Sequence, residues 1–382
     1  MLRSTPVRRS ERVRTALQWT VCLAGTVIVG ELLSTIGSPA PWLIAGLVVA
    51  AATALTSGQE LTVHRHLLRP AQGVIGVLAA APLALVSGRE LTRNLGVSVA
   101  TSLVTLALCL LSAYVLFRYA KRLDPATSIL STLAGGASGI ATMAPELEVD
   151  HRYVAMSQYL RLVIVTLTLP ALLIIAGGHE GSAALTEGGL TPATAVILAC
   201  VIFGFGYVGK ALHLPAPFLL TPLIATLMLG VFASPEWMPI PTDLISALSY
   251  VVIGWQAGGS FSRASIRAFA RLLPITLATI ALMIAGCLAM AYAVSAIMTV
   301  PFSDAYLATT PGGIYAALAV AQSAGAGPLV TTAQVIRLIV MLVTAIVAAK
   351  YFARRSQERR RNNCGTSDYN HGQGHRVAAV RA

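Results

Sequence analysis

Two glutamine–arginine pairs stand near the start of two similar apolar segments. Gln158 and Arg161 belong to "SQYLRLVIVTLTLP", and Gln334 and Arg337 belong to the near copy "AQVIRLIVMLVTAI". A spacing of three residues places the two side chains of each pair on one face of a helix. An arginine inside a membrane span costs about 2.5–3.5 kcal/mol on insertion scales unless it reaches a polar interior or the interface. Its presence in both segments indicates a use.

Three uses of these arginines are open from the sequence. The guanidinium groups could bond backbone carbonyls that nearby broken helices expose, which is a structural role. They could instead capture an anion, because a guanidinium presents a planar fork of donors. Snorkelling to a lipid headgroup is the third use, and it suits Arg161 better if its helix begins near Tyr153.

Two glycine-rich segments, "LAGGASGIATMAP" and "TTPGGIYAALAV", provide the other candidate site. Adjacent glycines let a helix break and expose backbone groups, which is tolerated at membrane depth only where protein or water covers them. A half-helix that starts after Gly136 or Gly313 would direct its positive end at an anionic group. The alternative is that these small residues only allow close helix packing. The predicted substrate-binding residues are, besides the two Gln–Arg pairs, Gly135, Gly136 and Ser138 in the first segment and Pro311, Gly312, Gly313 and Tyr315 in the second.

Other ionisable residues suggest little chemistry. Glu31 is the one acid clearly inside a long apolar run, so it is a candidate for proton or ion coupling, although its place near the end of the run also suits a boundary residue. The seven histidines lie in predicted loops and the tail, and the cysteines show no metal-ligand spacing. The sequence therefore predicts no catalytic residue, no metal, no cofactor and no enzymatic activity.

The elements that position these residues are predicted to be membrane-spanning helices. The chain has 382 residues, of which 56% are hydrophobic and 11% charged, and its mean hydropathy is +0.74. Soluble domains are less apolar than this. The apolar runs are about 20 residues long, enough for a helix to cross roughly 30 Å of hydrocarbon. They do not alternate polar and apolar residues, which argues against a barrel.

Positive charge is concentrated at the two ends of the chain. Residues 1–15 and 353–382 carry most of the formal net charge of +12. Basic ends beside hydrophobic spans are typical of cytoplasmic segments that face an anionic leaflet. We predict a basic N-terminus, a disordered basic tail and the lipid bilayer as partner, with no nucleic acid. Homo-oligomerisation is left open.

The chain contains an internal duplication. Four blocks recur in the same order at offsets of 176 to 178 residues: the two Gln–Arg pairs, the two glycine-rich segments, "GVIG" with "VVIG", and "SPAPWLIAGLVVA" with "LPAPFLLTPLIAT". An almost constant offset indicates two structural repeats, which we place at residues 16–178 and 190–352.

The repeats are predicted to have opposite orientations in the membrane. The expected crossings are 16–36, 40–57, 70–87, 95–117, 153–177, 192–209, 215–233, 243–260, 274–298 and 328–350, with 126–147 and 304–323 as re-entrant or broken segments. Five crossings per half is an odd number, so the second repeat must be inverted. This topology puts both termini and most arginines and lysines inside, with Arg89 and Arg93 as the exceptions.

Inverted repeats with matching interruptions are a recurring plan of secondary transporters, which bind substrate near the midplane through discontinuous helices. The sequence therefore favours a transporter of a small solute, with its site between the repeats. The alternative, which belongs to another functional class, is an accessory membrane protein that does not transport a solute.

The paired blocks resemble those of the AbrB duplication family of bacterial membrane proteins. The resemblance covers nearly the whole chain apart from its first dozen residues and its tail. It implies a multi-pass protein of the bacterial inner membrane with ten or so helices and a transporter-like architecture. Labels used in the family include ammonia monooxygenase, for which this chain lacks metal-ligand residues, and regulator of gene expression.

This chain departs from the family pattern in its glycine blocks. The first block reads Ala-Gly-Gly at 134–136, where the family usually has Pro-Gly-Gly, and Gly139 stands where members often carry a glutamate. Tyr315 and Ala316 likewise supply no acid in the second block. These departures weaken a cation-binding role and leave a site for a neutral or anionic solute.

Overall fold

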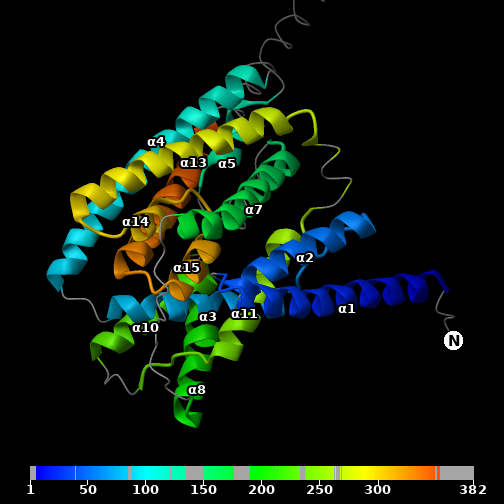
Figure 1. The fold of residues 1–382 in the computed structure, drawn as a ribbon, viewed down its shortest axis with the longest axis horizontal. Coiled ribbons are helices and arrows are strands. Elements are labelled where there is room, and N and C mark those ends of the chain that lie inside the picture. The colour runs from blue at the N-terminus through cyan, green and yellow to red at the C-terminus, as the bar shows by residue number, and fades with distance from the viewer. Residues whose placement is uncertain are drawn as a thin grey trace, which may run out of the picture.

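The protein folds as an assembly of helices in a computed structural model (Figure 1). The structure describes residues 6–352 except 39, 85–87, 121–122, 135–148, 176–189, 213, 215, 233–236, 262, 264–266, 268 and 349–350, and no strand occurs within the described part. The helices are α1 (Pro6–Thr35), α2 (Pro41–Ser57), α3 (Arg65–Ala84), α4 (Gly88–Tyr119), α5 (Pro125–Thr132), α7 (His151–Ile175), α8 (Pro192–Ala199), η2 (Cys200–Phe205), α9 (Gly206–Ala211), α10 (Pro217–Phe232), α11 (Asp243–Gly258), α13 (Leu273–Met298), α14 (Phe302–Thr309), α15 (Ile314–Ser323) and Pro328–Ala348, which we call the C-terminal helix.

Five of the described helices are long and apolar enough to cross a membrane: Arg14–Thr35, Thr92–Tyr119, Pro192–Ala211, Leu273–Met298 and Pro328–Ala348. Large apolar side chains such as Leu17, Leu103 and Ile297 are exposed on them, as expected of surfaces that contact lipid. The predicted all-helical, membrane-type fold is therefore confirmed. A helix occurs at each of the ten predicted spanning positions, but the count of ten crossings stays a prediction.

The two halves of the chain contain the same kinds of element in the same order. A short eight-residue helix, α5 in the first half and α14 in the second, follows a long helix in each case. Ala40 and Ala216 precede α2 and α10, and both adopt a left-handed backbone conformation with φ of 51° and 44°. Non-glycine residues rarely adopt this conformation because it is strained. Its occurrence at both equivalent positions indicates that the duplication extends to backbone detail.

The halves interlock through two equivalent helix pairs, α2 with α11 and α3 with α10. A Cβ atom added to Gly254 would lie 2.4 Å from the carbonyl oxygen of Leu43, and one added to Gly76 would lie 2.5 Å from that of Leu219. Only glycine allows backbones to approach this closely. At the repeat offset, Gly76 corresponds to Gly254 and Leu43 corresponds to Leu219. Each contact joins a glycine of one half to a leucine of the other half, so exchanging the two halves converts one contact into the other.

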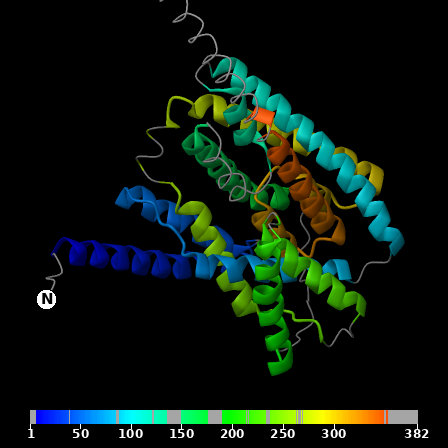
Figure 2. The ribbon, with the colours of Figure 1, turned by 180° about the vertical axis from the view of Figure 1, so that it is seen from behind.

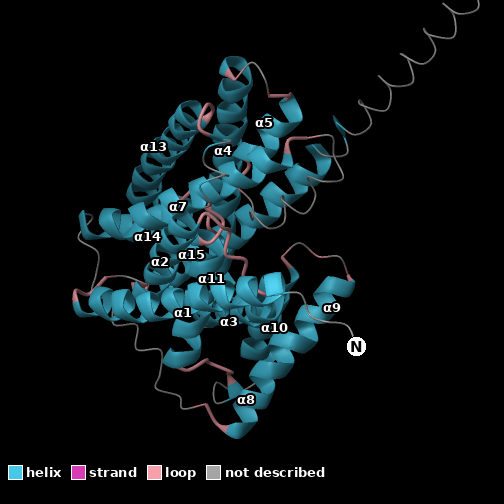
Figure 3. Ribbon diagram, turned by 90° about the vertical axis from the view of Figure 1, so that its right-hand side faces the viewer, coloured by secondary structure: helices cyan, strands magenta, loops and turns pink. Residues whose placement is uncertain are grey.

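The helices form two groups, each drawn from both halves. Figure 3 shows α1, α3, α8, α9 and α10 on one side, which with α2 and α11 form what we call the first group. The second group consists of α4, α5, α7, α13, α14 and the C-terminal helix, and α4 and α13 run alongside each other in it (Figure 2). Helix α15 contacts both α3 and α7 and so connects the groups.

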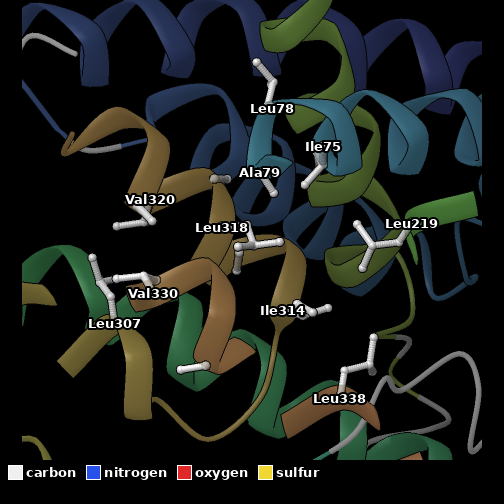
Figure 4. Close-up of a cluster of buried hydrophobic side chains, with 14 of the residues drawn as sticks. Ile75, Leu78, Ala79, Leu219, Leu307, Ile314, Leu318, Val320, Val330 and Leu338 are labelled. Carbon is white, nitrogen blue, oxygen red and sulfur yellow. The ribbon is translucent and has the colours of Figure 1, made fainter. Parts of the chain in front are cut away.

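A shared hydrophobic core joins the two groups (Figure 4). Ile75 and Leu78 of α3 and Leu219 of α10 belong to the same buried cluster as Leu318 of α15 and Leu338 of the C-terminal helix. Burial of these side chains therefore positions α15 between the groups.

The start of α5 allows a test of the local structure. Pro125 occupies the first turn, and the Asp124 carboxylate accepts a hydrogen bond from the backbone N–H of Thr127 at 3.2 Å. Replacing Asp124 with alanine is expected to reduce the free energy of unfolding by about 1 kcal/mol, because the N-cap is lost. The thermal midpoint of the purified protein in detergent measures this. Asp124→Asn, which can still cap, is the control, and equal midpoints for the two variants would contradict the assignment.

Candidate functional site

The end of α5 is held by the first Gln–Arg pair. Carbonyls in the last turn of a helix have no partner within it. Arg161 on α7 donates through Nη1 to the carbonyl of Thr132 at 2.8 Å and through Nη2 to that of Leu133 at 3.0 Å. Gln158 donates to the carbonyls of Leu130 at 2.7 Å and Leu133 at 3.0 Å, and its Oε1 accepts a hydrogen bond from Arg161. We call this arrangement the first clamp.

A second clamp holds the end of α14 in the same way. Arg337 on the C-terminal helix donates to the carbonyl of Thr310 and to Oε1 of Gln334. Gln334 donates to the carbonyl of Leu307. Leu307 and Thr310 match Leu130 and Leu133 at the repeat offset, so the glutamine bond and one arginine bond of the first clamp recur in the second. A cation at a helix C-terminus is also favourable for the helix dipole.

These contacts decide between two of the proposed uses of the arginines. Arg161 and Arg337 are only 4% and 3% exposed, so neither reaches a headgroup and the snorkelling alternative is wrong. The predicted bonding of exposed carbonyls is confirmed in both repeats. Capture of an anion stays a prediction.

The two buried arginines lack acidic partners among the described residues. Arg161 bonds backbone carbonyls and the amide oxygen of Gln158, and Arg337 bonds a carbonyl and the amide oxygen of Gln334, so no carboxylate is among their observed acceptors. Two cations within electrostatic range in an apolar interior produce a positive potential that carbonyl dipoles only partly offset. Within the described residues, the site therefore carries positive charge that no carboxylate balances.

The second glycine-rich segment lies directly against the first clamp. Gly312 and Gly313 have φ of +116° and +68°, which only glycine adopts without strain. A Cβ atom added to Gly312 would lie 2.9 Å from Nε of Arg161. An arginine of the first half thus contacts the helix break of the second half. Beyond the break, Tyr315 lies on α15, which contacts α3 at the boundary between the two groups.

The predicted site residues are therefore partly assembled. Both Gln–Arg pairs and Pro311, Gly312, Gly313 and Tyr315 lie around the ends of α14 and α15. Gly135, Gly136 and Ser138 lie outside the described residues. Glu31 is exposed on α1, which packs against α2, and the structure does not bring it to the arginines. Its coupling role stays a prediction.

Thr166 is a site residue that the sequence analysis missed. It lies on α7, is 1% exposed, and its hydroxyl has no hydrogen-bond partner among the described residues. A Cβ atom added to Gly313 would lie 4.0 Å from that hydroxyl. Thr166 follows Arg161 by five residues, outside the spacing that defines a helix face, and the duplication places Leu342 at the matching position. Neither pattern could have identified it.

No group of three or more His, Cys, Asp or Glu residues that could hold a metal occurs within the described ranges. The guanidinium, amide, hydroxyl and backbone N–H groups at the site can donate hydrogen bonds. Such a site can bind and orient a solute.

Known proteins match this chain over almost its whole length. A family model described as "Transition state regulatory protein AbrB" matches residues 6–353. The chain is similar to the "Putative regulator AbrB" of Escherichia coli (strain K12), with 29% identity over 356 residues that cover 90% of this chain and 99% of the relative. It is also similar to the "Uncharacterized protein YhjN" of Bacillus subtilis (strain 168), with 26% identity over 341 residues that cover 82% and 87%. The similarity thus extends over both repeats.

Proposed function

This chain belongs to the AbrB family, and we propose that it is a secondary transporter that moves a small solute across the bacterial inner membrane. The observation that carries the proposal is the contact between Arg161 of the first half and the break at Gly312 of the second, in a buried and positively charged place. Transporters built from repeats bind their substrates where such discontinuous helices meet.

The proposal includes ten crossings, two inverted repeats and cytoplasmic termini. The exchange of partners between α2–α11 and α3–α10 supports a two-fold relation between the halves, because equivalent contacts with the halves exchanged are what a two-fold axis produces. Five crossings per half would put this axis in the membrane plane. Arginines and lysines would then lie mostly on the cytoplasmic side.

Within this proposal, the moving units are the two helix groups. Backbone contacts at Gly76 and Gly254 interlock the halves, so a motion of one whole repeat against the other would have to break them. A motion of the second group against the first leaves these contacts intact. It would change access to α15, which lies between α3 and α7. Alternating exposure of a site at such a boundary is how secondary transporters work.

The proposal includes no enzymatic step. Carbonyls, amides and guanidinium groups bind and release a solute without changing its covalent bonds. The word "regulator" in the name of the Escherichia coli relative enters the proposal only indirectly: a transporter changes a solute concentration to which gene expression elsewhere responds.

Gly313→Val tests the proposal. The substitution is expected to reduce flux at least tenfold, because φ is +68° and the new Cβ would lie 2.6 Å from Cδ1 of Leu162. The measurement is uptake into proteoliposomes of labelled carboxylates, amino acids and amines, after a thermal-shift screen selects the solutes that stabilise the protein. Gly96→Val is the control, since no atom lies within 4 Å of the Cβ position at Gly96. Equal flux in wild type and a folded Gly313→Val variant would refute the proposed site of transport.

A further inference from the structure

We propose that the N-terminus of α15, Nε of Arg161 and the hydroxyl of Thr166 together form a binding site for one small oxyanion, of the size of acetate or nitrate. The idea that this anion is also the transported solute rests on the function proposed above. Binding at the site does not, and the experiment below separates the two.

The N-terminus of α15 supplies unpaired backbone donors. The helix runs for ten residues from Ile314, and its N-cap residue, Gly313, has no side chain that could accept a hydrogen bond. The first intrahelical hydrogen bond at this end joins the N–H of Ala317 to the carbonyl of Gly313. The N–H groups of Ile314, Tyr315 and Ala316 precede it and have no acceptor within the helix. Ile314 and Ala316 are buried, so this positive helix end lies inside the protein.

Two buried side chains present further unpaired donors to the same place. Arg161 uses Nη1 and Nη2 in the first clamp, but its Nε–H has no acceptor in the described part of the chain. The hydroxyl of Thr166 is also unpartnered there. Both face the glycines that precede α15, at 2.9 Å and 4.0 Å from the Cβ positions of Gly312 and Gly313. Buried donors in native proteins normally have acceptors, so this arrangement points to a ligand that provides them.

The donors define the chemical class of that ligand. Nε–H, the backbone N–H groups and a hydroxyl can all donate, and no carboxylate among the described residues pairs with Arg161. The ligand must therefore carry acceptors and negative charge. Planar oxyanions suit a guanidinium edge and adjacent backbone N–H groups best. A methyl group on Gly312 would lie 2.9 Å from Nε of Arg161, so the space beside Gly312 is narrow and we take the smallest planar oxyanions as the ligand class.

The duplication does not produce a second site of this composition. Leu342, fully buried on the C-terminal helix, matches Thr166 at the repeat offset and supplies no donor. The Thr166 hydroxyl therefore has no counterpart at the matching position of the other repeat. This asymmetry distinguishes the anion site from the two clamps, which are equivalent.

Thermal unfolding of the full-length protein in nanodiscs tests the inference. Potassium acetate and potassium nitrate are the probes, with potassium MES as a bulky anion and methylammonium MES as a small cation. A ligand that binds only the folded state raises the unfolding temperature. We expect acetate or nitrate to raise it and both MES salts to leave it unchanged.

Thr166→Val locates the binding. Valine has nearly the same shape as threonine, so the fold is retained while one donor to a charged ligand is lost. The apparent affinity for the probe is expected to fall about tenfold. Thr168→Val is the matched control, because the Thr168 hydroxyl already donates to the carbonyl of Val165 at 3.1 Å. Arg161→Lys, which keeps the charge but removes Nε–H, should weaken binding as well.

Each outcome decides one of the two proposals. Failure of both acetate and nitrate to stabilise the wild type, or equal responses of Thr166→Val and Thr168→Val, overturns the anion site. Uptake of labelled probe into proteoliposomes is measured in parallel. Binding that depends on Thr166 without any uptake supports the anion site and overturns the transport proposal. Uptake of another solute with which neither anion competes supports transport and overturns the assignment of the anion as substrate.

Discussion

Arg337→Met is expected to reduce the free energy of unfolding by about 2–4 kcal/mol and to abolish flux. Methionine is apolar and has a similar length, so it fills the space but donates no hydrogen bond. The carbonyl of Thr310 at the end of α14 and Oε1 of Gln334 then lose their donor in a buried place. Each buried unsatisfied acceptor costs about 1–3 kcal/mol, and removal of the buried charge offsets part of this loss.

Reversible unfolding in mixed detergent micelles measures the change. Arg118→Met is the matched control, because Arg118 is exposed in the last turn of α4 and its loss should change stability by less than about 0.5 kcal/mol. A double-mutant cycle with Gln334→Leu should give a coupling energy of about 1 kcal/mol or more, since the two side chains act as one unit. If Arg337→Met unfolds like the Arg118 variant, the second clamp does not support the end of α14.

Gly258→Val is expected to prevent folding. A Cβ atom at Gly258 would lie 2.0 Å from the carbonyl oxygen of Leu47 and 2.9 Å from the backbone nitrogen of Ala51. Both are backbone atoms of α2, so the clash cannot be relieved by a rotamer change. The helices α2 and α11 would have to separate, with a loss beyond the roughly 4–5 kcal/mol that marks exceptional substitutions.

Yield of monodisperse protein and resistance to proteolysis measure this effect. Gly204→Val provides the comparison, because Gly204 is also helical and no atom lies within 4 Å of its Cβ position. Gly76→Val tests the equivalent α3–α10 contact and should behave like Gly258→Val, since its Cβ would lie 2.5 Å from the carbonyl oxygen of Leu219. Folded, monodisperse protein from the Gly258 variant would show that the halves do not interlock as described.

The helices could be predicted from the sequence because the apolar runs and capping residues that specify each helix lie within its own segment. Long apolar runs predict helices wherever they occur, and Thr242 caps α11 at Asp243, where the sequence predicts a helix to begin. The first long helix of the second group is longer than expected. It begins at Gly88 instead of 95, because its polar first turns carry no hydropathy signal.

The role of the arginines could not be chosen from the sequence. Whether Arg161 bonds carbonyls or reaches a headgroup depends on Thr132 and Leu133, which are 29 and 28 residues away along the chain. Such a contact exists only after α5 and α7 have packed together. The duplication nevertheless predicted the same role for Arg337 as for Arg161, and Arg337 also bonds a backbone carbonyl.

The sequence by itself determined the helical class, the duplication, the family and most of the residues around the site, because each rests on composition, periodicity or a repeated motif. Only the tertiary structure decided that the halves interlock through glycine contacts, that both clamps hold helix ends, and that Thr166 lies beside Gly313. The physical reason is distance along the chain. Hydropathy is a property of each segment, whereas a hydrogen bond or a backbone contact between segments depends on how the whole chain packs.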